Sequence, residues 1–135
     1  MKRYHLDANV ILRFLRNDDP QQSPAARQLV ASAKAGHVIL ALSAVTVAEV
    51  FYAFRASYKL SRSDVAKLLG TLLSASVFEL EHEARILDAI ARVEKFNVDF
   101  GDAYLAATAI ETKEAIASFD KDFKKFPDLI LYALG

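Results

Sequence analysis

The chain has 135 residues, of which 53% are hydrophobic, with 17 acidic and 17 basic side chains and no cysteine. This length and composition predict a single globular domain over residues 1–135 and exclude a disordered chain. The balanced charge excludes a global basic field, so a nucleic acid would have to be held by a local patch or through a metal ion. Without cysteine, disulfides, thiolate metal sites and cysteine nucleophiles are excluded, which agrees with a reducing cytosol.

We expect no targeting signal at the N-terminus. Asp7 comes too early in the chain for the apolar core of a signal peptide, and no apolar run approaches the length that spans a membrane. We therefore expect a soluble cytoplasmic protein with no membrane partner.

The first third of the chain alternates between strands and helices. Residues 2–6 predict a short buried strand that leads into Asp7, and a helix that ends near Asn17 follows at once. A second helix is expected over residues 23–35, and residues 38–42 predict a fully buried strand because none of them is polar. This order is typical of a parallel α/β sheet.

The rest of the chain continues the alternation. Ser43 is a candidate N-cap for a helix over residues 44–58, and Ser61 opens another helix that runs to Gly70 or a little beyond. The remaining predicted elements are a strand at 76–80, a long helix from Glu81 to about Lys95, an alanine-rich helix through Ile110, a strand at 115–119 that ends on Asp120, and an edge strand at 129–131. We see no repeat or linker, so one doubly wound domain is predicted.

Glu49 is the only charged residue between Val38 and Phe54. A lone carboxylate is costly to bury without a partner. Glu49 could simply point at solvent, but the flanking Val45, Tyr52 and Ala53 are not typical of a solvated face. We therefore interpret Glu49 as a candidate functional residue.

Three aspartates are expected at the same edge of the sheet as Glu49. Asp7 and Asp120 follow predicted strands, Asp102 lies at the start of the alanine-rich helix, and the carboxyl ends of parallel strands meet at one edge. Each aspartate has a simpler explanation. Asp7 could cap the next helix, Asp99 and Asp102 could form an N-cap arrangement, and Asp120 could be only a turn former.

Carboxylates gathered in a small cleft repel one another, and a divalent cation relieves this repulsion. Ligands that are all oxygen favour Mg²⁺ or Mn²⁺ over zinc. Such ions activate water and offset charge on a leaving oxygen, so the chemistry indicated is phosphodiester hydrolysis. Asn9 and Ser118 could hold waters or hydrogen-bond the metal ligands.

Four short motifs carry a family resemblance: LDAN at 6–9, VAEV at 47–50, DFGDAYLAA at 99–107 and SFDKDF at 118–123. Together they resemble PIN-domain proteins, specifically the VapC-type ribonuclease toxins of prokaryotic toxin–antitoxin pairs. The resemblance covers essentially the whole chain, in the right order and at about the right domain size.

The resemblance implies a three-layer α/β/α sandwich around a parallel sheet with the first strand central. It also implies a metal-dependent endoribonuclease with an acidic pocket for Mg²⁺ or Mn²⁺, a homodimer, and a cognate antitoxin that fills or covers the active site. The residues that match the catalytic and metal-binding acidic quartet are Asp7, Glu49, Asp102 and Asp120. Asp99 matches a subfamily feature and is a further candidate ligand, followed by Asp122, while Asn9 and Ser118 match the polar positions that accompany the acids.

Two other functions stay open. One is a phosphatase that forms an aspartyl-phosphate on Asp7, although the general acid expected two residues later is replaced by Asn9. The other is a non-catalytic α/β module that binds a protein, for which Glu49 and Asp102 would be dispensable.

Overall fold

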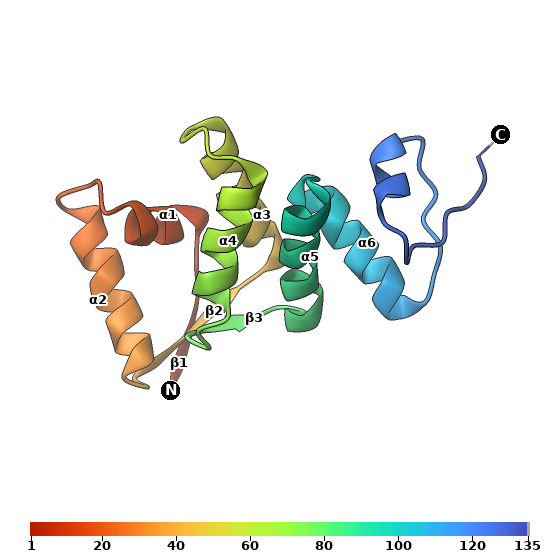
Figure 1. The fold of residues 1–135 in the computed structure, drawn as a ribbon. Helices are drawn as coiled ribbons and strands as arrows, with labels where there is room; N and C mark the ends of the chain where they lie inside the picture. Colours follow the sequence, from red (N-terminus) through yellow and green to blue (C-terminus); the bar gives the residue numbers. More distant parts are fainter. Residues whose placement is uncertain (135) are drawn as a thin grey trace.

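The computed structural model describes residues 1–134, which form one parallel sheet and six α-helices. The strands are β1 (Lys2–His5), β2 (Val38–Leu42) and β3 (Phe78–Leu80), paired in the order β1-β2-β3. The helices are α1 (Ala8–Arg16), α2 (Gln22–Lys34), α3 (Ala44–Ala56), α4 (Arg62–Leu73), α5 (Glu83–Phe96) and α6 (Phe100–Thr112), followed by the 3-10 helix η1 (Lys121–Lys125). The predicted α/β class is confirmed, and Figure 1 shows α1 and α2 at one end of the molecule and η1 at the other. Within residues 1–134, none of the helices has the length and apolar character needed to cross a membrane.

Local signals in the sequence set the helix boundaries. The Ser43 hydroxyl accepts a hydrogen bond from the Thr46 N–H at 3.1 Å, and the Ser61 hydroxyl accepts one from the Asp64 N–H at 3.1 Å. Each bond satisfies a backbone donor that the first turn of a helix leaves free. Gly36, with a φ of 81°, turns the chain between α2 and β2 in a conformation that favours glycine.

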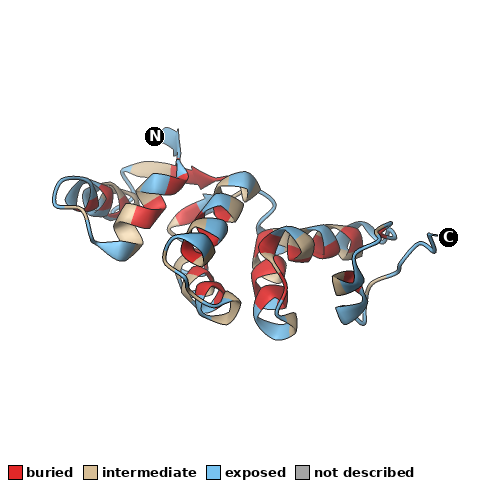
Figure 2. Ribbon diagram, turned by 90° about the horizontal axis from the view of Figure 1, so that it is seen from above, coloured by how far each residue is buried: buried red, intermediate tan, exposed pale blue. Residues whose placement is uncertain are grey.

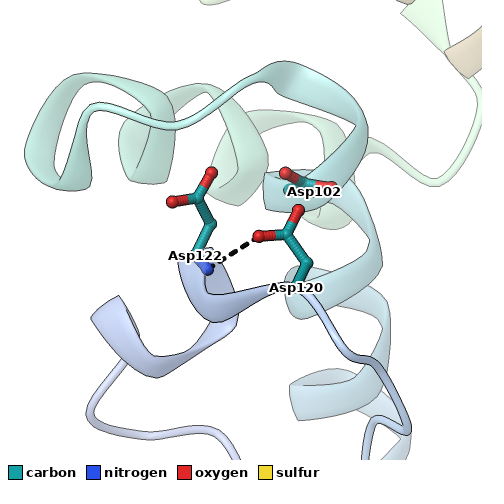
Figure 3. A group of neighbouring side chains, drawn as sticks. All are labelled: Asp102, Asp120 and Asp122. Carbon is teal, nitrogen blue, oxygen red and sulfur yellow. Dashed lines mark hydrogen bonds between the residues drawn. The ribbon is translucent and has the colours of Figure 1, made fainter.

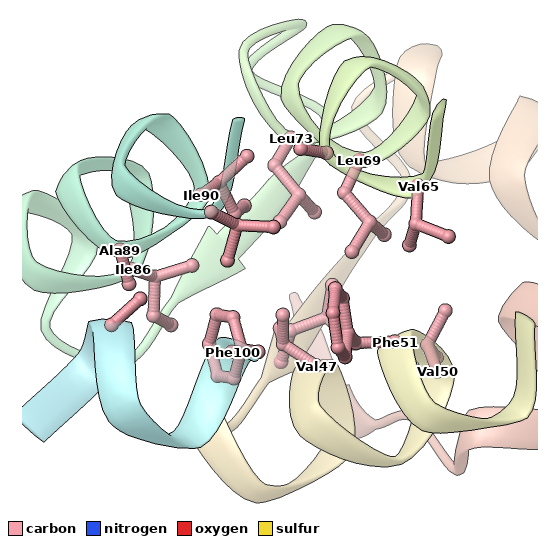
Figure 4. Packing of buried hydrophobic residues seen from close by; sticks show 14 of the residues in the cluster. Val47, Val50, Phe51, Val65, Leu69, Leu73, Ile86, Ala89, Ile90 and Phe100 are labelled. Atoms are coloured by element: carbon pink, nitrogen blue, oxygen red, sulfur yellow. The ribbon is translucent and has the colours of Figure 1, made fainter. Parts of the chain in front are cut away.

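The core lies where α3, α4, α5 and the start of α6 meet (Figure 4). Phe51 and Phe54 of α3 are fully buried, and the Phe51 ring centroid lies 6.2 Å from that of Phe100. Small buried side chains at Ala103 and Ala106 let α6 lie close to its neighbours. Figure 2 shows buried residues along the inward sides of these helices, whereas β1 is exposed.

Four predictions about the sheet are wrong. The first strand is not central, because β2 lies between β1 and β3. Residues 115–119 do not form a strand of this sheet, and in place of a strand at 129–131 there is an isolated parallel bridge between Ile116 and Leu131. The physical reason is that α6 packs along α5 and delivers residues 115–119 away from the sheet. As a result, β1 is an exposed edge strand rather than a buried one.

Arg92 fastens the C-terminal segment to α5. Its side chain is only 8% exposed, and it donates to both Asp128 oxygens, at 2.9 and 2.5 Å, and to Asp88 at 3.0 Å. The guanidinium also lies over the Phe126 ring, 5.5 Å from its centroid. Hydrogen bonding to Arg92 holds the pKa of the Asp128 carboxyl below its usual value, and the same pairing raises the pKa of Arg92.

Replacing this arginine should destabilise the protein. We expect Arg92→Met to lower the free energy of unfolding by about 1.5–3 kcal/mol, because hydrogen bonds to charged groups contribute about that much. The loss should be full above the ordinary pKa of an aspartate. It should fade as the pH falls through the lowered pKa of folded Asp128, where the carboxylate is protonated in both states. Urea unfolding at several pH values measures it, with the exposed Arg27→Met as the matched control.

Candidate metal centre

Three carboxylates gather between α6 and η1 (Figure 3). One oxygen from each of Asp102, Asp120 and Asp122 lies within 4.8 Å of the other two. Asp102 comes from the first turn of α6, Asp120 is the N-cap of η1, and Asp122 is in the first turn of η1. Residues separated by an entire helix and loop therefore present their charges to one small volume.

Short-range hydrogen bonds hold the η1 side of this acidic group. The Ser118 hydroxyl accepts a hydrogen bond from the Asp120 N–H at 3.0 Å, and Asp120 Oδ1 accepts one from the Asp122 N–H at 2.9 Å. Asp120 therefore does act as a turn former, as the simpler explanation proposed, through one of its two oxygens. A carboxylate has two oxygens, so one capping bond leaves capacity for a metal ligand.

The electrostatics of the group are unfavourable without a cation. Burial raises the pKa of the half-buried Asp102 above its ordinary value, and the charges of Asp120, Asp122 and Asp99 raise it further. The nearby Arg62 guanidinium opposes this rise. The protein thus holds a carboxylate whose charge is disfavoured, and a bound cation would reverse that preference.

Removing this charge should stabilise the metal-free protein. We expect Asp102→Asn to raise the melting temperature at pH 7 in EDTA by about 1–4 °C, because asparagine carries no charge for burial and the neighbouring acids to disfavour. The gain should be complete above the raised pKa of folded Asp102. It should vanish as the pH falls below the ordinary aspartate value, where the carboxyl is neutral in both states. Circular dichroism measures the shift.

Bound metal should favour the native protein over Asp102→Asn in thermal stability. Mg²⁺ or Mn²⁺ should raise the melting temperature of the native protein more than that of Asp102→Asn, since an ion that binds only the folded state stabilises it. Glu94→Gln, which removes an exposed carboxylate from α5, is the matched control and should respond like the native protein. An equal metal response in native protein and Asp102→Asn would contradict a site that includes Asp102.

Asp99 lies beside the acidic group but is engaged elsewhere. It is the N-cap of α6, yet its side chain makes no capping bond. Instead Asp99 Oδ1 accepts a hydrogen bond from Arg62 Nε at 2.9 Å, and Arg62 also donates to the Asn97 carbonyl at 3.2 Å. This ion pair joins the start of α4 to the start of α6 and places one positive charge near the three carboxylates.

Asp7 and Glu49 lie outside this group. Among residues 1–134, the group of three or more ligand side chains that meet within 4.8 Å includes neither of them. Asp7 is exposed at the N-cap of α1 and its side chain makes no capping bond, so the capping alternative is not realised. Their assignment as metal ligands stays a prediction.

Glu49 points at solvent in the structure, which is the simpler of the two explanations given for it. Glu49 is exposed on α3, and on the same helix Val45 is 67% and Tyr52 is 43% exposed. The inference that this face of α3 is shielded from water is therefore wrong. Val45 and Tyr52 are thus apolar side chains that stay exposed, although the Tyr52 hydroxyl accepts a hydrogen bond from the Gly101 N–H at 3.2 Å.

Asp122 is the member of the group that sequence reasoning ranked last. The signal that identifies it is local: an Asp-Lys-Asp run at the start of a short helix, where the first carboxylate caps the N–H of the third residue. Of the two polar companions, Ser118 supports Asp120 as described, and Asn9 is exposed at the start of α1 beside a pocket that Arg13 and Gln22 also line.

The fold and the acidic group together define an α/β protein with a site suited to a hard divalent cation. The PIN domain family matches residues 4–129, so the chain belongs to that family. The PIN domain is a metal-dependent nuclease fold. A comparison with curated proteins finds no match.

The three carboxylates fit the metal that this family implies. Oxygen ligands of one Mg²⁺ lie at about 2.1 Å from the ion and therefore at most about 4.2 Å apart. The oxygens of Asp102, Asp120 and Asp122 are already within 4.8 Å of one another, so small side-chain rotations suffice. The same donor set suits Mn²⁺.

Proposed function

We propose that this protein is an endoribonuclease that hydrolyses RNA phosphodiester bonds with Mg²⁺ or Mn²⁺, as the toxin of a cytoplasmic toxin–antitoxin pair. The observation that carries the proposal is the convergence of Asp102, Asp120 and Asp122 within a PIN domain. When bound, the cation supplies an activated water and offsets negative charge on the reacting phosphate.

Each residue of the acidic group has a role that follows from its position. Asp102 of α6 and Asp120 and Asp122 of η1 would hold the cation, since one oxygen of each lies within 4.8 Å of the other two. Ser118 keeps Asp120 in place through the Asp120 N–H. Asp7 and Glu49, the other members of the acidic quartet, are proposed to complete the catalytic centre.

The test is cleavage of a broad RNA panel by purified protein that is free of any antitoxin. We expect cleavage that requires Mg²⁺ or Mn²⁺ and stops on addition of EDTA. Failure to cleave any RNA with either ion, by protein shown to be folded, would reject the proposal. If that protein still bound a partner tightly, a non-catalytic protein-binding module would be the better description.

A phosphatase is the second enzymatic candidate, since Asp7 is exposed and its side chain makes no capping bond. Incubation with a phosphoryl donor followed by mass spectrometry distinguishes the two. A trapped aspartyl-phosphate on Asp7 would favour the phosphatase over the nuclease.

We further propose that the protein forms a homodimer and binds a cognate antitoxin that covers its active site. The support is the resemblance of the motifs to VapC-type toxins together with the family match. The product of a small open reading frame directly upstream is the antitoxin to test. It should bind the purified protein and suppress RNA cleavage, and binding without suppression would contradict a cover over the active site.

A further inference from the structure

Two basic side chains meet on one backbone carbonyl beside the acidic group. Arg62 Nη1 donates to the Asn97 carbonyl at 3.2 Å, and Lys125 Nζ donates to the same oxygen at 3.5 Å. Arg62 is the first residue of α4, Asn97 is the C-cap of α5, and Lys125 is the last residue of η1. Figure 1 shows these three places on the same side of the molecule as the start of α6.

Each of the two cations is also paired with a carboxylate at the metal centre. Arg62 Nε lies 2.9 Å from Asp99 Oδ1, and Lys125 Nζ lies 3.3 Å from Asp122 Oδ1. Hydrogen bonding to Asp99 raises the pKa of Arg62. The charges of Asp122 and Asp102 add to this rise, so the guanidinium lies within the field of the acidic group. The two cations therefore border the metal centre.

Both cations keep donors for a further ligand. A guanidinium has five N–H donors and an ammonium has three. The contacts described above use two donors of Arg62 and two of Lys125. The side chains are 26% and 43% exposed, so a ligand can reach the donors that remain. The planar fork of an arginine matches the oxygens of a phosphate, and a lysine binds the same anion as a point charge.

The charge balance of the site explains why an RNA substrate would need these cations. Asp99 and the three carboxylates of the acidic group together carry four negative charges. One divalent cation would leave two of them uncompensated, and a phosphodiester anion would be repelled. Arg62 and Lys125 offset those two charges. Because the chain as a whole has no net charge, cations at the site itself have to hold a polyanion there.

We propose that Arg62 and Lys125 together bind a backbone phosphate of a single-stranded RNA beside the metal centre. They are then substrate-binding residues rather than metal ligands. Contact with phosphate alone positions the strand and does not select a base. The identity of the ligand as RNA rests on the proposed function, whereas the paired cations do not.

A simpler explanation is that both side chains only stabilise the end of α5. Cations near the C-terminus of a helix bond its last carbonyls and interact favourably with its dipole. Under that explanation, replacing Arg62 or Lys125 lowers the melting temperature and leaves RNA binding unchanged. Binding measurements therefore distinguish the two explanations.

Binding of RNA in the absence of metal is the first test. Fluorescence anisotropy with a labelled single-stranded oligouridylate, in EDTA and at low salt, measures affinity without cleavage. We expect Arg62→Gln and Lys125→Gln each to weaken binding by about tenfold, because hydrogen bonds to charged groups contribute about that much. Lys67→Gln removes the same charge from an exposed position of α4 and is the matched control, which should bind like the native protein.

The salt dependence of binding identifies a phosphate contact. For a single strand, each neutralised phosphate contributes about 0.7 to the slope of log affinity against log salt concentration. The variant that carries both Arg62→Gln and Lys125→Gln should therefore have a slope smaller by about 0.7. Arg62→Lys should keep the native slope but recover only part of the affinity, since an ammonium cannot reproduce the bonds of the guanidinium.

Two results of these measurements would overturn the proposal. One is an unchanged affinity and salt slope in the double variant, with a native circular dichroism spectrum. The other is no measurable binding of the oligouridylate by the native protein at low salt.

Titration calorimetry with Mn²⁺ separates phosphate binding from an effect on the carboxylates. Arg62→Gln and Lys125→Gln should bind Mn²⁺ at least as tightly as the native protein, because each removes a positive charge near the ion. If the affinity for Mn²⁺ falls as far as the affinity for RNA, the two residues act by arranging the acidic group, and the proposal is wrong.

The binding result and the cleavage result can fail separately. If the native protein never cleaves RNA but its binding depends on both cations, the proposed function fails and the phosphate site stands. If the native protein cleaves RNA and the double variant binds the oligouridylate normally, the proposed function stands and the phosphate site fails.

Discussion

Asp102→Asn is expected to lower metal-dependent RNA cleavage by about 100-fold or more while leaving the fold intact. Asp102 meets both Asp120 and Asp122 within 4.8 Å, so it is the link between α6 and η1 in the metal centre. Asparagine has nearly the same shape but no charge. It therefore weakens both the hold on the cation and the electrostatic support of the reacting phosphate, effects that typically reach this size. Initial rates on a labelled RNA with Mg²⁺ measure the loss.

The stability of the same variant separates chemistry from unfolding. Because Asp102→Asn should raise the melting temperature of the metal-free protein, a loss of cleavage in that variant cannot be assigned to a weakened fold. Glu94→Gln should cleave at the native rate. Native cleavage by Asp102→Asn would place the metal elsewhere and would contradict the role of the acidic group.

The helices were predictable because their signals are local. Ser43 and Ser61 cap helices at the points where a hydroxyl precedes an apolar periodic segment. Val47, Phe51 and Phe54 recur at helical spacing on one face of α3, and all three are buried. Interactions over three or four residues decide these features, and a single sequence contains all of them.

The place of each strand was not predictable in the same way. Residues 115–119 are apolar enough for a strand, but their composition does not say which edge they meet. The packing of α6 on α5 decides where that segment goes, and this depends on contacts between helices distant in sequence. The central position of β1 was implied by the family resemblance, and it requires a strand on the side of β1 away from β2, where the sheet has none among residues 1–134.

The candidate site was likewise predictable where it depends on local sequence and not where it depends on strand order. Asp102 and Asp120 were expected together and meet in the structure. Asp122 joins them through a short-range turn, whereas the separation of Asp7 from this group reflects the open edge of β1. The sequence therefore identified candidate acidic residues better than it identified which of them lie together. Which residues meet at a sheet edge depends on strand order.

Phe51→Ala is expected to lower the free energy of unfolding by about 3–5 kcal/mol, since that is the usual cost of removing a buried phenylalanine. Phe51 is 1% exposed and belongs to the cluster that joins α3, α4, α5 and α6. A loss of this size is a large share of the stability of an ordinary domain. Urea unfolding measures it, and Val45→Ala on the exposed face of the same helix should change the stability by less than about 0.5 kcal/mol.

The same side chain links the core to the metal centre. The Phe51 ring packs against Phe100, the first residue of α6, and Asp102 lies two residues further along that helix. The milder Phe51→Leu should keep the fold, at a cost smaller than that of Phe51→Ala, but let the start of α6 shift. We therefore expect its affinity for Mn²⁺ to fall, measured by titration calorimetry. An unchanged Mn²⁺ affinity in both Phe51→Leu and Val45→Ala would mean that the core does not position Asp102.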